Sequence, residues 1–292
     1  PLPQAVLTGH RHPAATSQPT LTMARLITGI IFLPLIFVSI WAASLTWVFI
    51  LLVVAAISLG LYEFWSLAAR NEMAPDLPAG FACAFLVVAA FYFGVIDKLL
   101  LVIPAFTIII LARSLWRGLS FDRILGSTGS TLLGVLYVAL LGSFLIATRL
   151  YFESPLGSQL TTLFFIILMG SDIAAYYIGR TFGRHKLAPK ISPGKTWEGA
   201  IGGFIASLLV TLVVKYTFFP QLGLIAGLSL AALMNVLGVI GDLTESALKR
   251  GAGAKDAANI LPGHGGLLDR LDSLLFNAPV IYYFGLIYFN QK

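Results

Sequence analysis

Long stretches of the sequence contain no charged residue, and their lengths predict membrane-spanning helices. A helix needs about 20 apolar residues to cross the hydrocarbon core of a bilayer. Residues 26–62 contain no Asp, Glu, Lys or Arg, which suits two spans with a break near Trp41–Ser44. Shorter charge-free stretches follow at 77–96, 99–112, 124–148, 154–171, 199–214, 216–241 and 273–291. The stretches are continuous rather than alternating, so they predict about nine transmembrane helices, with 99–112 borrowing residues at its ends, and disfavour a β-barrel.

The composition agrees with this pattern. The chain has 292 residues, of which 58% are hydrophobic and 11% are charged, whereas soluble proteins are about 25% charged. So few charges exclude a soluble globular enzyme, a disordered protein and a nucleic-acid-binding module. Cys83 is the only cysteine, which excludes an intrachain disulfide and a Cys-based zinc site. We therefore expect an all-α, polytopic integral membrane protein.

Basic residues predict the orientation of the spans. If consecutive helices form hairpins, fourteen lysines and arginines lie on one side of the membrane. The opposite side then holds only Lys98, Arg149, Lys215 and Lys292. Cytoplasmic loops carry the excess of Lys and Arg, so the first side is predicted to be cytoplasmic. The formal net charge of +6 follows from the same bias.

The chain divides into three parts by composition. Residues 1–22 are rich in Pro, Thr, Gln and His, and Met23 directly precedes the first apolar stretch. We expect 1–22 to be a disordered tail or an added extension before a natural start at Met23. Residues 23–123 are expected to form about four N-terminal transmembrane helices. Residues 124–292 are expected to form a catalytic transmembrane domain of about five helices.

Charged residues are concentrated in two segments of the second half. Residues 171–198 and 241–272 together hold half of all the charged residues, on about a fifth of the chain. Charge in or beside a membrane span is costly and by default indicates a functional site. Asp172 shares a helix face with Tyr176 and Gly179, so this face is expected to meet a polar cavity or a cation, the alternative being a structural ion pair.

The segment 192–196 invites comparison with a phosphate-binding loop. It contains Gly194, Lys195 and Thr196, but a Walker A motif needs a glycine at position 189, which is a proline here, and a preceding strand. We reject that motif. Pro193 suits the first turn of a helix, where Lys195 could meet a phosphate; the alternative is an ordinary cytoplasmic lysine.

The second segment carries two carboxylate clusters. Asp242, Glu245 and Lys249 fall on one helix face, and Asp269 and Asp272 share a face at the start of the last helix. The loop between them is rich in glycine and can fold back, so the clusters are expected to meet. Oxygen-only ligands favour Mg²⁺, with Mn²⁺ as an option, over zinc.

The loop itself carries His264, Gly265 and Gly266. The glycine amides can bind a phosphate. His264 can act as a base or have a structural role in a turn.

The segment 246–272 resembles the signature of the phosphatidate cytidylyltransferase (CDP-diacylglycerol synthase) family. The matching residues are Ser246, Lys249, Arg250, Lys255, Asp256, Pro262, His264, Gly265, Gly266, Asp269, Arg270 and Asp272. Residues 186–199 also resemble bacterial members. The resemblance implies the reaction CTP + phosphatidate → CDP-diacylglycerol + pyrophosphate, in a bacterial inner membrane with the active site facing the cytoplasm. It implies CTP, phosphatidate and membrane lipids as partners, no nucleic acid, and leaves a homodimer open.

The resemblance also implies roles for individual residues. The implied metal ligands are Asp242 and Asp269, with Asp172, Asp256 and Asp272 as secondary candidates. Other implied catalytic residues are Lys249, Lys255 and Asp256. The implied phosphate-binding residues are Lys195, Arg250, Arg270, His264, Gly265 and Gly266.

Two other functions fit the residues alone. A CTP-dependent polyprenol or phytol kinase would transfer the γ-phosphate instead. A secondary transporter would use buried carboxylates for cations, with inverted repeats and acidic residues near the bilayer midplane. The sequence has no evident repeat and its carboxylates cluster at one membrane edge, so the cytidylyltransferase is favoured.

Overall fold

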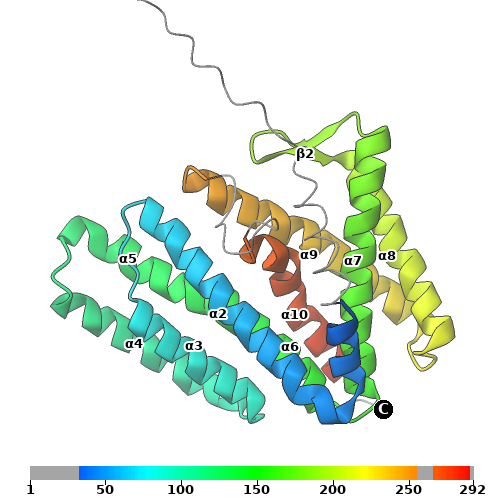
Figure 1. Cartoon of the computed structure of the whole chain (residues 1–292), viewed down its shortest axis with the longest axis horizontal. Coiled ribbons are helices and arrows are strands. Elements are labelled where there is room, and N and C mark those ends of the chain that lie inside the picture. Colours follow the sequence, from blue (N-terminus) through cyan, green and yellow to red (C-terminus); the bar gives the residue numbers. More distant parts are fainter. Residues whose placement is uncertain (1–32, 255–265, 290–292) are drawn as a thin grey trace, which may run out of the picture.

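The computed structural model describes residues 33–254 and 266–289 (Figure 1). The expected tail at 1–22 lies outside the described residues. So do four of the expected site residues, which are Lys255, Asp256, His264 and Gly265.

The described chain is built from helices that run back and forth. These are α2 (Thr46–Arg70), α3 (Leu77–Tyr92), α4 (Leu99–Trp116), α5 (Phe121–Gly134), α6 (Leu141–Tyr151), α7 (Leu156–Phe182), α8 (Trp197–Thr217), α9 (Leu224–Gly251) and α10 (Leu268–Phe289). Short 3₁₀ turns precede α2 and α4, namely η1 (Ala43–Leu45) and η2 (Ile96–Lys98). A π-helical turn, η3 (Val135–Leu140), joins α5 and α6 into one span.

These helices confirm a polytopic, all-helical membrane protein. Among the described residues, seven helical segments are long and apolar enough to cross a bilayer. The stretch 77–96 forms α3, which has only 16 residues. Residues 33–41 are helical and end at the expected break, just before η1. The stretch 99–112 extends to Trp116, as its short length required.

One element differs from the prediction. Residues Lys186–Ala188 and Ser192–Thr196 form an antiparallel hairpin of two strands, β1 and β2. Pro193 therefore lies in a strand, and the expectation that it begins a helix is wrong. Helix α8 begins at Trp197, four residues after Pro193, and its N-cap is Thr196. The Thr196 hydroxyl accepts a hydrogen bond from the amide of Gly199 at 3.2 Å. The physical reason is this side-chain cap, which gives α8 a start that does not need proline.

The helices form two groups with a pair between them (Figure 1). Helices α3, α4 and α5 lie on one side and α7 and α8 on the other, while α9 and α10 pack against each other between them. Helix α10 contacts both α2 and α6, so it joins the N-terminal helices to the C-terminal ones. Trp65 in the N-terminal group is fully buried and donates a hydrogen bond to the carbonyl oxygen of Ser130 at 3.2 Å.

The hairpin marks one end of the helix bundle (Figure 1). The connections after α2, α4, α7 and α9 all fall at this end because the helices alternate in direction. Most of the described basic residues lie there, whereas Lys98, Arg149 and Lys215 lie at the opposite end. Arg149 is buried and its Nε donates to the carbonyl oxygen of Ile40 at 2.9 Å, so its charge meets the end of a helix rather than lipid.

Candidate active site

A polar cavity of about 660 Å³ opens beside the hairpin, between α7, α8 and α9. Helix α7 can approach α8 closely because α8 presents glycines there. A Cβ atom on Gly199 would lie 2.8 Å from the carbonyl oxygen of Ala175, and one on Gly203 would lie 3.0 Å from that of Ser171. The residues lining the cavity include Ser171, Asp172, Tyr176, Gly179, Arg180, Lys186, Lys195, Thr196, Asn235, Asp242 and Ser273.

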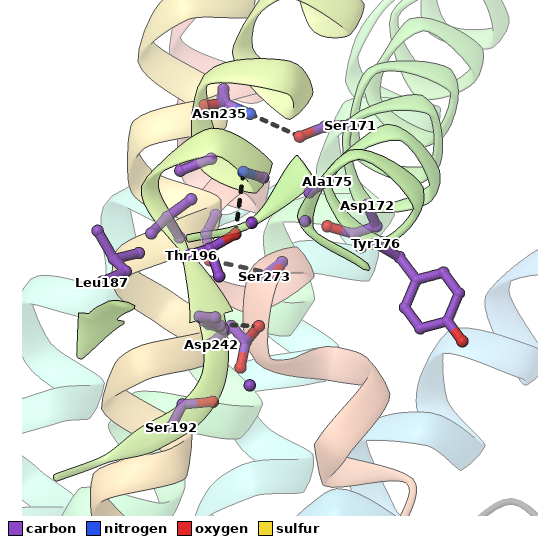
Figure 2. Close-up of a pocket in the computed structure, with 18 of the residues that line it drawn as sticks. Ser171, Asp172, Ala175, Tyr176, Leu187, Ser192, Thr196, Asn235, Asp242 and Ser273 are labelled. Atoms are coloured by element: carbon purple, nitrogen blue, oxygen red, sulfur yellow. Dashed lines mark hydrogen bonds and ion pairs between the residues drawn. The ribbon is translucent and has the colours of Figure 1, made fainter. Parts of the chain in front are cut away.

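The predicted face of α7 lines this cavity. Asp172, Tyr176 and Gly179 all border it, as their spacing indicated. In Figure 2 the carboxylate of Asp172 and the side chains of Asn235 and Asp242 lie around one space, while the Tyr176 ring points away from them. The Tyr176 hydroxyl accepts a hydrogen bond from Arg180 at 3.0 Å.

The hairpin places a lysine against the carboxylate of α9. Lys195 on β2 forms an ion pair with Asp242, with 2.5 Å between Nζ and Oδ2. Asp242 also accepts a hydrogen bond from Ser246 one turn further along α9, at 3.4 Å. The pairing of Lys186 with Thr196 across the hairpin fixes the register that presents Lys195.

A second ion-pair group joins α9 to α10. Lys249 lies between two carboxylates, with its Nζ 2.6 Å from Glu245 and 2.6 Å from Asp269. Asp269 also accepts the backbone N–H of Gly266 at 3.1 Å. The prediction that the two carboxylate clusters meet is therefore confirmed. The start of α10 lies against the last turns of α9.

The carboxylates at the hairpin end of the bundle fall into two groups with different charged neighbours. Asp172, Asp242 and Asp272 interact electrostatically with one another and with Lys195, and Arg270 also acts on Asp172. Asp269 instead belongs to the group around Lys249. Within residues 33–254 and 266–289, no three His, Cys, Asp or Glu side chains form a ready ligand set.

This donor chemistry fits Mg²⁺. The ion takes oxygen ligands and usually binds through one or two carboxylates plus substrate phosphates, rather than in an all-protein cage. The carboxylates around Asp242 supply such oxygens, and the cavity of about 660 Å³ leaves room for phosphates beside them.

Two of the expected phosphate-binding groups, the Arg250 side chain and the Gly266 amide, form hydrogen bonds within the protein. Arg250 is exposed and donates to the carbonyl oxygens of Ile191 and Ala254, each at 3.4 Å, so it ties the hairpin to the loop after α9. The N–H of Gly266 is taken up by Asp269. Arg270 borders a smaller cavity instead.

That smaller cavity is mostly apolar. It has a volume of about 200 Å³ and lies between the helical residues 33–41, α7 and α10. It shares Leu168, Asp172 and Ser273 with the larger cavity. Its other lining residues are Leu33, Ile36, Phe37, Phe165, Met169, Arg270 and Leu274. An apolar space and a polar one therefore meet at Asp172.

The structure adds residues that sequence reasoning missed. Asn235 lies two turns before Asp242 on α9 and donates a hydrogen bond to Ser171 at 2.5 Å, and its helical spacing from Asp242 was the available signal. Tyr137 lies in the π-helical turn η3, is buried, and interacts electrostatically with the carboxylates of α9 and α10. Such π-turns often mark functional sites. Arg180 and Lys186 also border the larger cavity.

Together these features define a class of protein: a polytopic membrane protein with a polar, charged cavity at one end of its helices. The chain belongs to the cytidylyltransferase family, whose sequence profile matches residues 23–288. It is similar to the phosphatidate cytidylyltransferase of Pseudomonas aeruginosa, with 35% identity over 88% of this chain and 94% of that protein.

Other relatives are matched over shorter lengths. Phosphatidate cytidylyltransferase 4, chloroplastic, of Arabidopsis thaliana is 32% identical over 82% of this chain and 67% of that protein. The phosphatidate cytidylyltransferase of Haemophilus influenzae is 44% identical over 41% of this chain and 43% of that protein. The alignments with the Haemophilus and Brucella proteins cover half of those relatives or less.

Proposed function

We propose that this chain is a phosphatidate cytidylyltransferase, which converts CTP and phosphatidate into CDP-diacylglycerol and pyrophosphate. The observation that carries the proposal is the cavity beside the hairpin, where Lys195 forms an ion pair with Asp242 of α9. Lys249 joins α9 to Asp269 of α10 in a separate ion-pair group. The family match over residues 23–288 supports it. Relatives that carry this activity in their names are similar over most of the chain.

The reaction joins a water-soluble nucleotide to a lipid. An oxygen of the lipid phosphate attacks the α-phosphorus of CTP, the bond from that phosphorus to the bridging oxygen breaks, and pyrophosphate leaves with the electron pair. The lipid phosphate is already ionised, so its attack needs no general base. The protein must therefore bring two anions together and offset their charge.

The cavities suit these two substrates. Arg180, Lys186 and Lys195 border the larger cavity and offset the charge of a triphosphate that enters from the hairpin end. The smaller apolar cavity suits the acyl part of phosphatidate, with Arg270 near the lipid phosphate. The two substrates would meet near Asp172, which borders both spaces.

Mg²⁺ would be held by Asp242 and Asp269, with Asp172, Asp256 and Asp272 as secondary candidates, and Mn²⁺ as an alternative ion. When bound, the metal neutralises charge on the triphosphate and the leaving pyrophosphate. Lys195 and Lys249 already compensate the two main carboxylates. Lys255 and His264 keep their proposed roles as further active-site groups.

The proposal includes a place in the cell. Nine spans result if α3 and the helix containing residues 33–41 also cross the membrane beside the seven long segments. The concentration of basic residues at the hairpin end supports a cytoplasmic site in a bacterial inner membrane. The N-terminal part, 23–123, then supports a catalytic part, 124–292. A homodimer is part of the proposal and is tested by its mass in detergent.

Labelled CTP tests the reaction directly. The purified full chain is incubated with phosphatidate, Mg²⁺ and CTP labelled on either the α- or the γ-phosphate. Label from the α-position in the lipid product supports the proposal. Label from the γ-position would identify a kinase, and no transfer of either label would refute a nucleotide-dependent transferase.

A further inference from the structure

Glu63 lies on α2, in the N-terminal part of the chain, yet its carboxylate binds the start of α10. Its Oε1 accepts the backbone N–H of Leu267 at 2.9 Å, and its Oε2 accepts that of Leu268 at 2.7 Å. The side chain is fully buried. A buried carboxylate in a membrane protein is costly, so this contact indicates a specific role.

The contact replaces a local helix cap. The first N–H groups of a helix have no partner within that helix, and a carboxylate there also interacts favourably with the helix dipole. A cap usually comes from the residue just before the helix, whereas Glu63 is more than 200 residues away in sequence. Gly60, on the same face of α2, permits the approach, since a Cβ there would lie 3.1 Å from Leu271. The start of α10 is thus anchored to α2.

The anchored turn carries active-site groups. Asp269 follows Leu268 directly, accepts the N–H of Gly266 at 3.1 Å and binds Lys249 at 2.6 Å. Asp272 lies one turn further along α10 and is buried. A shift of the first turn of α10 would therefore move Asp269 relative to Lys249 on α9.

We infer that Glu63 is a positioning residue, which holds the first turn of α10 so that Asp269 meets Lys249 in the active site. This inference rests on the proposed function. It gives α2, in the N-terminal part of the chain, a task in the reaction. Misplacing a reacting group by about 1 Å can cost about 100-fold in rate.

The test compares two neutralised carboxylates. Glu63→Gln removes one acceptor from the start of α10. Asp76→Asn is the matched control, because Asp76 is also a buried carboxylate that accepts a helix-start amide, that of Ala79 at 3.2 Å, but on α3. We expect Glu63→Gln to lower kcat by about 10- to 100-fold with an unchanged KM for CTP. Asp76→Asn should keep the wild-type kcat per folded molecule.

Amide hydrogen exchange of the described residues 266–272 supplies a readout that needs no activity. Exchange there should be faster in Glu63→Gln and unchanged in Asp76→Asn. An unchanged kcat or unchanged exchange in Glu63→Gln would overturn the inference, as would an equal loss of kcat in Asp76→Asn. A wild-type protein without cytidylyl transfer would instead refute the proposed function and leave the exchange result standing.

A folding failure of Glu63→Gln does not leave the question open. Glu63→Asp keeps the charge but is one methylene too short to reach both amides. The same two measurements then apply, and a wild-type kcat with wild-type exchange would overturn the inference.

Discussion

Removing the ammonium group of Lys249 should destabilise the protein strongly. Lys249 is 13% exposed and lies between Glu245 and Asp269, which are 1% and 17% exposed. The substitution Lys249→Met keeps the approximate length of the side chain but leaves two carboxylates without their cation. The change in the free energy of unfolding depends on two terms: the ion-pair attraction that is lost, and the desolvation cost of the carboxylates, which stay buried in the variant.

The magnitude follows from the distances. At 2.6 Å and an effective dielectric constant of about 20, the ion pair between Lys249 and Asp269 attracts by about 6 kcal/mol. Desolvation of each buried ion opposes this by several kcal/mol. Removing one partner of a buried ion pair lowers the free energy of unfolding by about 3–5 kcal/mol, because the remaining charge stays buried and uncompensated. We expect Lys249→Met to lower the free energy of unfolding by that amount.

A double-mutant cycle checks the reasoning. Unfolding is followed by tryptophan fluorescence as a denaturing detergent replaces a mild one, for wild type, Lys249→Met, Asp269→Asn and the double variant. The double variant buries one carboxylate fewer, so the coupling energy between the two sites should be about 1–3 kcal/mol. Lys98→Met is the control, because its pair with Asp97 is 65% and 68% exposed, and exposed pairs contribute about 0–1 kcal/mol. A coupling energy below about 0.5 kcal/mol would refute the buried pair.

Three further predictions concern the site and its support. Asp242→Asn should abolish synthesis of CDP-diacylglycerol while the protein still inserts and folds, and full activity of this variant at low Mg²⁺ would contradict its role as a metal ligand. Burial opposes ionisation of Asp76, but hydrogen bonds from Arg113 and a backbone amide of α3 hold its pKa below the usual value. Its stabilising effect is therefore present above the ordinary pKa of an Asp and is lost as the pH falls through the lowered pKa. The stability difference between wild type and Asp76→Asn should shrink below about pH 4, and a constant difference down to pH ~2 would contradict this. Gly199→Ala should cost about 1–3 kcal/mol and reduce activity, because its Cβ would lie 2.8 Å from a backbone carbonyl oxygen of α7. Gly129→Ala is the control, because it is also a helical glycine, on α5, and no atom lies within 4 Å of its Cβ.

The spans and the charged faces were predictable because they depend on local rules. A charge-free stretch of about 20 residues has few alternatives in a membrane. Helical spacing places Asp242, Glu245 and Lys249 on one face, and the structure confirms the pair between Glu245 and Lys249 at 2.6 Å. The same rule placed Asp172 and Tyr176 on the cavity wall.

Other features depend on contacts between distant segments. The hairpin at 186–196 is too short for a periodic pattern, and its proline suited a helix start equally well. Glu63 was the only acidic residue in an apolar stretch of the N-terminal part, and no local signal pointed to its partners on α10. The sequence did not indicate that Lys195 pairs with Asp242 or that Lys249 pairs with Asp269, because these ion pairs depend on where the hairpin and α10 lie.

The sequence by itself determined a membrane protein with a charged site at one end of its helices, because burial of charge in lipid is costly at every position. Only the tertiary structure decided which groups share that site. Hydrogen bonds and ion pairs act over about 3 Å, so they depend on how α2, α9, α10 and the hairpin pack. That packing brings Glu63 to a helix that begins more than 200 residues later.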